Sequence, residues 1–107
     1  MTTITFYLDE HERIKGFEAK DHAGFARSGK DIVCSAISVL TINTVNSFEE
    51  LIHADMIFKS DEKTGFMELR VTDYDNDQAQ LLFKSLKLGL EGVQESYPRY
   101  LSLNYRR

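Results

Sequence analysis

The chain has 107 residues, 42% of them hydrophobic, and a formal net charge of -4 at pH 7. This length fits one domain, residues 1–107, whose core is large enough to need neither a metal nor a disulfide. The 13 Lys and Arg are scattered along the chain, which disfavours direct binding of nucleic acid because phosphates are bound by clustered cations, whereas a basic peptide partner stays open. No apolar run approaches the roughly 18 to 20 residues of a membrane helix, and the first residues lack the features of a secretion signal. We therefore expect a cytoplasmic protein, in which the single cysteine stays reduced.

The first two predicted elements are strands. Residues 3–8 alternate, with Ile4, Phe6 and Leu8 on one side, which is the period of a half-buried strand. Residues 13–20 alternate again after a short polar turn, so the two segments are expected to form a hairpin. Residues 21–30 contain Gly24 and Gly29 and have no steady period, which indicates an ordered loop.

The most apolar stretch, residues 31–46, predicts a helix. Its apolar residues cover nearly the whole circumference, so we expect it to be buried on most sides. The β-branched content would also suit a strand, but the stretch is too long for one, and Asp31 is a suitable N-cap. Residues 47–52 either continue this helix or begin a second one, since Ser47 and Glu50 have the capping-box spacing.

The second half of the chain predicts strands at residues 55–60 and 65–72 around a polar turn. Asp77 is the expected cap of an amphipathic helix that ends at Pro98, and residues 100–105 form a closing strand. The fold class is therefore α+β: a mixed, mostly antiparallel sheet of about five strands covered by two main helices.

Several familiar sites fail on their spacing. Residues 24–30 follow the phosphate-loop pattern G-x-x-x-x-G-K, but Asp31 stands where Ser or Thr would hold magnesium, so nucleotide binding is disfavoured. The acidic run 73–77 lacks the later Gly and Glu of a calcium loop. The three histidines and Cys34 share no zinc-binding pattern, and we expect neither a metal nor a cofactor.

Cys34 and His22 form the remaining candidate site. A free cysteine in an apolar helix is most often an inert small hydrophobe. If Asp31 is the N-cap, however, Cys34 is the third helical residue, where unpaired N–H groups favour a thiolate. His22 lies in a polar segment, where its imidazole can accept the thiol proton and later protonate a leaving amine. From these residues alone, a nucleophile and an inert core residue both stay open.

Residues 21–38 read D-H-A-G-F-A-R-S-G-K-D-I-V-C-S-A-I-S. This stretch resembles the signature of the ribosomal-processing cysteine proteases called Prp, approximately G-H-A-x-x-A-x-x-G-x-D-I-V-C-A-A-x-S. The chain length, the hairpin before the histidine, residues 76–80 and the closing residues 103–105 are also similar to that family. The resemblance implies a homodimer of mixed α/β fold that removes a short N-terminal extension from large-subunit ribosomal protein twenty-seven.

The resemblance also implies roles for individual residues. It assigns the nucleophile to Cys34 and the proton donor and acceptor to His22, and it makes Asp31 and Ser38 candidates for supporting roles. Two positions depart from the signature: Asp21 replaces the usual Gly, and Ser35 replaces the usual Ala. An acid beside His22 favours the imidazolium form, and with it the thiolate–imidazolium pair.

The expected mechanism is acyl transfer. The Cys34 thiolate attacks the scissile carbonyl, N–H groups at the start of the helix hold the oxyanion, and His22 protonates the departing amine. Residues 23–30 are predicted to act as a mobile loop over the peptide, with Gly24 and Gly29 as hinges. The alternative is a dimer that binds a ribosomal or other basic peptide without cleaving it and has an inert Cys34.

Overall fold

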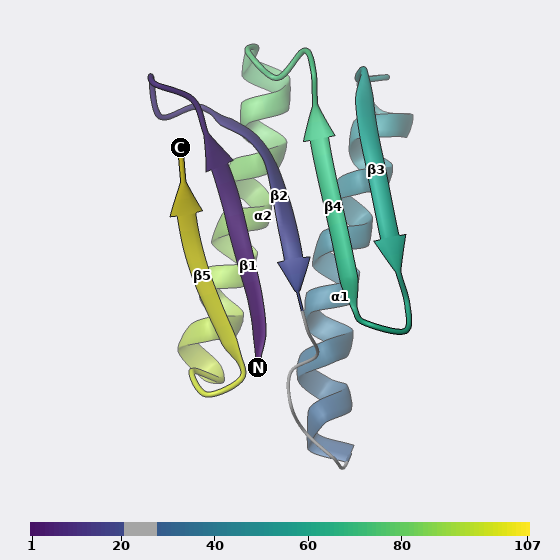
Figure 1. The fold of residues 1–107 in the computed structure, drawn as a ribbon, viewed down its shortest axis with the longest axis vertical. Coiled ribbons are helices and arrows are strands. Elements are labelled where there is room, and N and C mark those ends of the chain that lie inside the picture. The colour runs from purple at the N-terminus through teal and green to yellow at the C-terminus, as the bar shows by residue number, and fades with distance from the viewer. Residues whose placement is uncertain (21–27) are drawn as a thin grey trace.

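The computed structural model describes the backbone of residues 1–20 and 28–107, and the side chains of residues 1–20 and 32–107. The strands are β1 (Thr2–Leu8), β2 (Ile14–Lys20), β3 (Met56–Asp61), β4 (Phe66–Val71) and β5 (Leu101–Arg106). The helices are α1 (Ser28–Glu50) and α2 (Asp77–Ser96) (Figure 1). The predicted α+β class and the order of the elements are confirmed, with strand bounds that differ from the expected ones by one residue.

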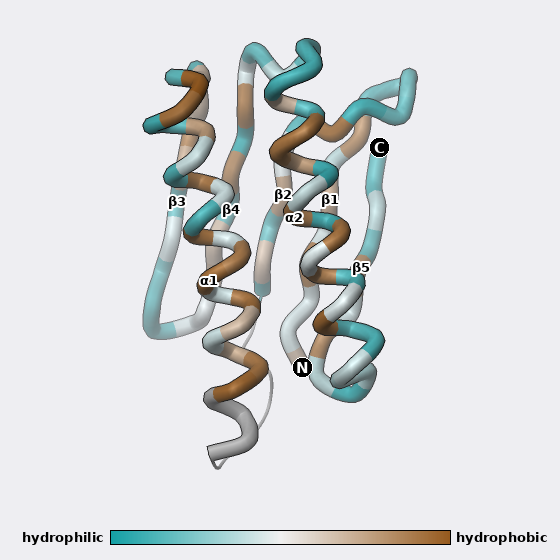
Figure 2. Tube along the Cα trace, turned by 180° about the vertical axis from the view of Figure 1, so that it is seen from behind, coloured by the Kyte–Doolittle hydropathy of each residue, from teal (hydrophilic) through white to brown (hydrophobic). Residues whose placement is uncertain are grey.

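The five strands form one mixed sheet in the order β3-β4-β2-β1-β5. All neighbouring pairs are antiparallel except β1 and β5, which run parallel. The predicted hairpin is the β1–β2 pair, in which Phe6 lies opposite Phe17. Both helices lie on the same face of the sheet, as the two views from opposite sides show (Figures 1 and 2). The described residues therefore form two layers, and among them no helix lies on the other face of the sheet.

The core fills the space between the sheet and the two helices. Ile4, Phe6, Phe17 and Leu69 point to it from the strands and are fully buried. The rings of Phe48 on α1 and Phe83 on α2 meet with centroids 4.6 Å apart and an interplanar angle of 49°. Burying a side chain of this size contributes about 2–3 kcal/mol, so these contacts fix how the helices lie on the sheet.

Helix α1 is continuous from Ser28 to Glu50, which settles the choice between one helix and two. It begins three residues before Asp31, so the prediction that Asp31 is its N-cap is wrong. Gly29 also lies within α1 rather than in the expected loop, while the rest of that loop, residues 21–27, lies outside the described residues. A helix start is hard to place from sequence here because Ser28 and Asp31 are both residue types that begin helices.

One face of α1 stays exposed in the single chain. Val33, Ile37, Val45 and Phe48 face the core. On the opposite side the exposed fractions are 59% for Ile32, 66% for Val39 and 40% for Ile42, and Figure 2 shows apolar positions along the visible side of this helix. The expectation that the helix is buried on most sides is therefore wrong for one chain.

Residues 32–50 of α1 are long and apolar enough, by length and composition alone, to cross a membrane. This corrects the expectation that no stretch approaches that length. Core helices of globular proteins have the same property, and α1 contributes buried side chains to the core of this fold.

Asn76, not Asp77, caps α2. The Asn76 side chain accepts a hydrogen bond of 2.9 Å from the backbone N–H of Ala79, and its backbone is extended, with φ -151°. Asp77 is the first residue of the helix, where its negative charge favours the N-terminus. The helix ends at Ser96, and the Tyr97 N–H donates to the Val93 carbonyl just before Pro98, as the sequence predicts.

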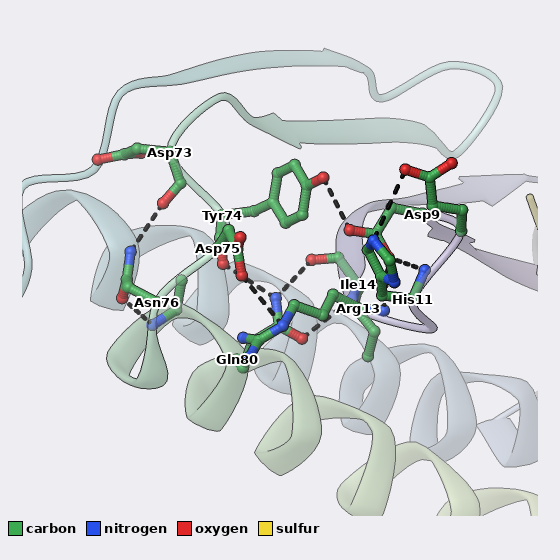
Figure 3. A network of polar contacts seen from close by, with 11 residues as sticks. Asp9, His11, Arg13, Ile14, Asp73, Tyr74, Asp75, Asn76 and Gln80 are labelled. Carbon is green, nitrogen blue, oxygen red and sulfur yellow. Dashed lines mark hydrogen bonds and ion pairs between the residues drawn. The ribbon is translucent and has the colours of Figure 1, made fainter.

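A polar network joins the start of α2 to the β1–β2 turn (Figure 3). The amide of Gln80, only 6% exposed, pairs with both backbone groups of Ile14: its Oε1 accepts from the Ile14 N–H at 3.0 Å, and its Nε2 donates to the Ile14 carbonyl at 2.8 Å. The same Nε2 donates to the Tyr74 carbonyl. These bonds satisfy main-chain groups at the first residue of β2, which would otherwise be buried without partners.

Asp9 extends this network to the turn itself. Its carboxylate accepts the Tyr74 hydroxyl at 2.9 Å and the backbone N–H groups of His11 and Arg13. Partial desolvation acts to raise the pKa of Asp9, but these hydrogen bonds outweigh it and lower the pKa below its ordinary value. The hydrogen bond between the Tyr74 hydroxyl and Asp9 raises the pKa of Tyr74. The charged carboxylate of Asp9 therefore holds the turn in place.

Candidate functional site

Cys34 lies inside α1, six residues beyond its first residue, Ser28, and is half-buried against the core. At 1.5 Å per residue this places it about 9 Å along the helix from the start. The prediction that Cys34 is the third residue of the helix is therefore wrong. Because the effect of a helix end falls off within the first turn, the end of α1 supplies little stabilisation of a thiolate at this depth.

The other predicted site residues divide into three groups. His22, Asp21 and Gly24 lie outside the described residues. Gly29 and Asp31 lie in the first turn of the α1 backbone. Ser38 is exposed, one helical turn beyond Cys34, and both residues line the same cleft. The structure therefore brings Cys34 and Ser38 together, while the position of His22 relative to them stays a prediction.

The cleft has a volume of about 320 Å³ and lies between α1 and the end of the sheet where β3 turns into β4. Its helical wall is formed by Cys34, Ile37, Ser38, Thr41 and Ile42, which share one face because they are spaced at three or four residues. A volume near 300 Å³ is enough to enclose part of a small ligand or a few side chains of a peptide.

The side of the cleft opposite α1 comes from strands that are distant in sequence. Ala19 of β2 lies opposite Met67 of β4 in the sheet, and both line the cleft beside Phe66. Asp61, the last residue of β3, and Glu62, the first of the turn, line it as well. Sequence analysis missed these residues, because no local motif reports that β2 and β4 are neighbours.

Thr41 illustrates why the helical wall is mainly apolar. It is 1% exposed, and its hydroxyl donates to the Ile37 carbonyl of its own helix at 2.8 Å. The Thr41 hydroxyl is thus satisfied within its own helix.

Within residues 1–20 and 32–107 no group of three or more His, Cys, Asp and Glu side chains gathers as a metal site would require.

The family model for cysteine protease Prp matches residues 1–102, almost the whole chain. The chain belongs to this family. The ribosomal processing cysteine protease Prp of Mycoplasma genitalium is 34% identical over 87 residues, which cover 80% of this chain and 83% of that protein. The resemblance carried by residues 21–38 is thereby confirmed.

Two crystal structures of the essential ribosomal processing protease Prp from S. aureus share the fold. One contains a covalently linked product peptide and matches with a TM-score of 0.91 at 26% identity, over 99% of this chain and 100% of that chain. The other contains a substrate peptide and matches with a TM-score of 0.90 at 25% identity, over the same shares of the two chains. The two-layer arrangement of sheet and helices is therefore the arrangement of this protease family.

Proposed function

We propose that this Prp-family protein is a cysteine endopeptidase that removes the N-terminal extension of large-subunit ribosomal protein twenty-seven. One observation carries the proposal: a chain of a cysteine protease family has a single cysteine, and that cysteine lines a cleft. Cys34 is accordingly the nucleophile, and His22 is its proton donor and acceptor. The peptides bound to the S. aureus relative support a peptide as the substrate class.

The proposed reaction is an acyl transfer in two steps. His22 accepts the Cys34 thiol proton, and the thiolate attacks the carbonyl carbon of the scissile bond. The C–N bond then breaks, the departing amine takes the proton from His22, and a thioester to Cys34 remains. Water hydrolyses this thioester and releases the extension peptide as a carboxylate.

The position of Cys34 within α1 determines which group activates its thiol. Since the helix end lies about 9 Å away along the helix axis, it contributes little to ionising the thiol. We therefore assign the activation of Cys34 mainly to His22. Ser38 is a candidate for contacting the peptide from the same wall of the cleft, Asp31 stays a candidate for a supporting role, and Gly24 stays the candidate hinge of a mobile loop.

We also propose that the protein acts as a homodimer, in which a second copy covers the exposed face of α1. Ile32 and Val39 are exposed on this face and line a shallow groove together with Ser35 and Ala36, and Ile42 is exposed nearby. Residues 32–48 include no charged side chain. An apolar and uncharged exposed helix face of this kind is typical of a protein interface rather than of a solvated surface.

Cleavage of a synthetic peptide that spans the extension and the first residues of the mature ribosomal protein tests the catalytic proposal. Mass spectrometry should show a single cut with the native protein. Cys34→Ala and His22→Ala should each lower the rate at least about 1,000-fold, since nucleophile and base act as a unit. Ser35→Ala, which restores the residue usual in the signature, is the matched control on the neighbouring exposed position and should cleave normally.

Cleavage by Cys34→Ala or by His22→Ala at the native rate would contradict the dyad. The alternative, a dimer that binds a ribosomal peptide without cleaving it, predicts binding with no cut by any variant. It also predicts that Cys34 alkylates with iodoacetamide no faster than free cysteine at a pH of about 6.5, where an ordinary thiol is protonated. An activated Cys34 should alkylate faster, and the His22→Ala variant should lose that advantage.

A further inference from the structure

Two carboxylates, those of Asp61 and Glu62, line the same cleft as Cys34, on the side formed by the β3–β4 turn. The turn is held by its own hydrogen bonds. The Asp61 Oδ1 accepts the Lys63 N–H at 2.9 Å, and the Asp61 carbonyl accepts the Gly65 N–H at 2.9 Å. The carboxylate of Asp61 is therefore fixed in place before any ligand arrives.

The acidic side chains elsewhere on the central strands are already neutralised. Glu18 on β2 lies 3.7 Å from the Lys20 ammonium, and Glu68 on β4 lies 3.0 Å from the Arg70 guanidinium. Within the part of the chain whose side chains are described, Asp61 and Glu62 have no such ion pair, although Lys63 is the next residue in sequence.

A cleft that combines the proposed nucleophilic thiol with two acidic residues, which have no ion pair among the described side chains, favours a positively charged ligand. Both acidic side chains are exposed, so an arriving cation can reach them, while water screens each contact. Ala19, Ile37 and Met67 make much of the remaining lining apolar, and Asp61 and Glu62 are the acidic residues among those that line the cleft. The net charge of -4 acts in the same direction on an approaching basic peptide.

We propose that Asp61 and Glu62 are specificity-determining residues that bind a Lys or Arg side chain of the substrate on one side of the scissile bond. This inference rests on the proposed function, which puts a peptide in the cleft. The two carboxylates select the basic residue and hold the peptide in register, so that the carbonyl to be attacked lies at Cys34. They take no part in the bond-breaking steps.

Peptide binding to the Cys34→Ala protein tests this without requiring cleavage. The probe is a fluorescein-labelled peptide that spans the N-terminal extension and the first mature residues of ribosomal protein twenty-seven. It is compared with versions in which each Lys or Arg is replaced singly by Gln, and binding is measured by fluorescence anisotropy. One replacement should weaken binding about three- to tenfold, and the double variant Asp61→Asn and Glu62→Gln should weaken binding of the unaltered peptide equally.

The decisive outcome is non-additivity. In the double variant, the sensitive Gln replacement should cost no further affinity, because the interaction has already been lost. Glu62→Lys should prefer the peptide in which that basic residue is replaced by Glu. Glu49→Gln, an exposed acid about 22 Å further along α1 than Cys34, is the matched control and should bind as the Cys34→Ala protein does.

Equal binding of all the peptides, or losses that add in the double variant, would overturn the role of Asp61 and Glu62. The cleavage assay separates this failure from a failure of the proposed function. A protein that cuts the peptide but ignores its basic residues leaves Cys34 as the nucleophile and removes only the specificity role. A protein that binds with the expected charge preference but never cuts removes the protease proposal and keeps the basic-peptide site.

Discussion

Gly16 of β2 is the position where a single added methyl group should damage the fold most clearly. A Cβ built there would lie 2.2 Å from the Leu69 carbonyl oxygen and 3.2 Å from the Arg70 Cα, both backbone atoms of the neighbouring strand β4. Backbone in the middle of a sheet cannot move aside without breaking strand pairing. We expect Gly16→Ala to cost about 3 kcal/mol, the upper end of the usual range for overpacking.

Two other glycines supply controls on α2. A Cβ at Gly92 would meet nothing within 4 Å, so Gly92→Ala should stabilise the protein by about 0.5–1 kcal/mol through helix propensity. A Cβ at Gly89 would lie 2.9 Å from Cδ2 of Leu40, a side-chain atom that can shift. Gly89→Ala should therefore stay within about 1 kcal/mol of the native protein, because the gain in propensity offsets the contact.

Urea unfolding followed by circular dichroism measures this series. With a slope of about 1.5 kcal/mol per molar urea, Gly16→Ala should unfold about 2 M earlier than the native protein and Gly92→Ala about 0.5 M later. All variants are compared at one protein concentration, since any self-association adds to apparent stability. A Gly16→Ala protein as stable as the native one, or a destabilised Gly92→Ala protein, would refute the packing argument.

Four further predictions concern the network at the β1–β2 turn, the sheet and the outer face of α1. Gln80→Leu should cost about 2–4 kcal/mol in urea unfolding, because the buried N–H and C=O of Ile14 lose their partners; a cost under about 1 kcal/mol would contradict the network. The lowered pKa of Asp9 means that its charged form stabilises the fold above about pH 4 and that this contribution disappears as pH falls through the folded-state pKa. The stability difference between the native protein and Asp9→Asn should thus shrink on acidification. An unchanged difference at about pH 2–3 would contradict a stabilising role for the Asp9 charge. Burial, with the nearby charge of Glu18, raises the pKa of Tyr7. Spectrophotometric titration of the native protein minus that of Tyr7→Phe isolates the Tyr7 phenolate, which should form at a higher pH than the phenolate of free tyrosine. Val39→Glu should halve the mass measured by sedimentation without loss of circular dichroism, whereas an unchanged dimer would place the interface elsewhere.

The elements of this fold follow from local patterns, and their arrangement does not. Alternation at Ile4 and Phe6 is enough to predict β1, and the helical period of α2 predicts its buried side. The parallel pairing of β1 with β5 joins segments nearly a whole chain apart, and no local signal reports it. The acidic side of the cleft was missed for the same reason, since it depends on where the β3–β4 turn lies relative to α1.

The errors at the helix ends have a different origin. Asn76 and Asp77 are both good caps, and only the position of the side-chain oxygen relative to the Ala79 N–H decides between them. The interpretation of α1 as buried on most sides was based on its apolar circumference, which reports how much surface avoids water but not whether the same chain covers it. Cys34 stands out in the sequence as the single cysteine, and the signature around it identifies the family, while its role as nucleophile stays a prediction.

The position of Cys34 between two core residues of α1 has a consequence for how the enzyme would fail on heating. Val33 and Ile37 flank it and are almost completely buried, so the sulfur atom is held by the same packing that holds the domain together. A nucleophile on a surface loop can drift out of alignment long before its domain melts. Here the thiol and the core should lose order in one cooperative event, so that thermal inactivation and unfolding share a single midpoint.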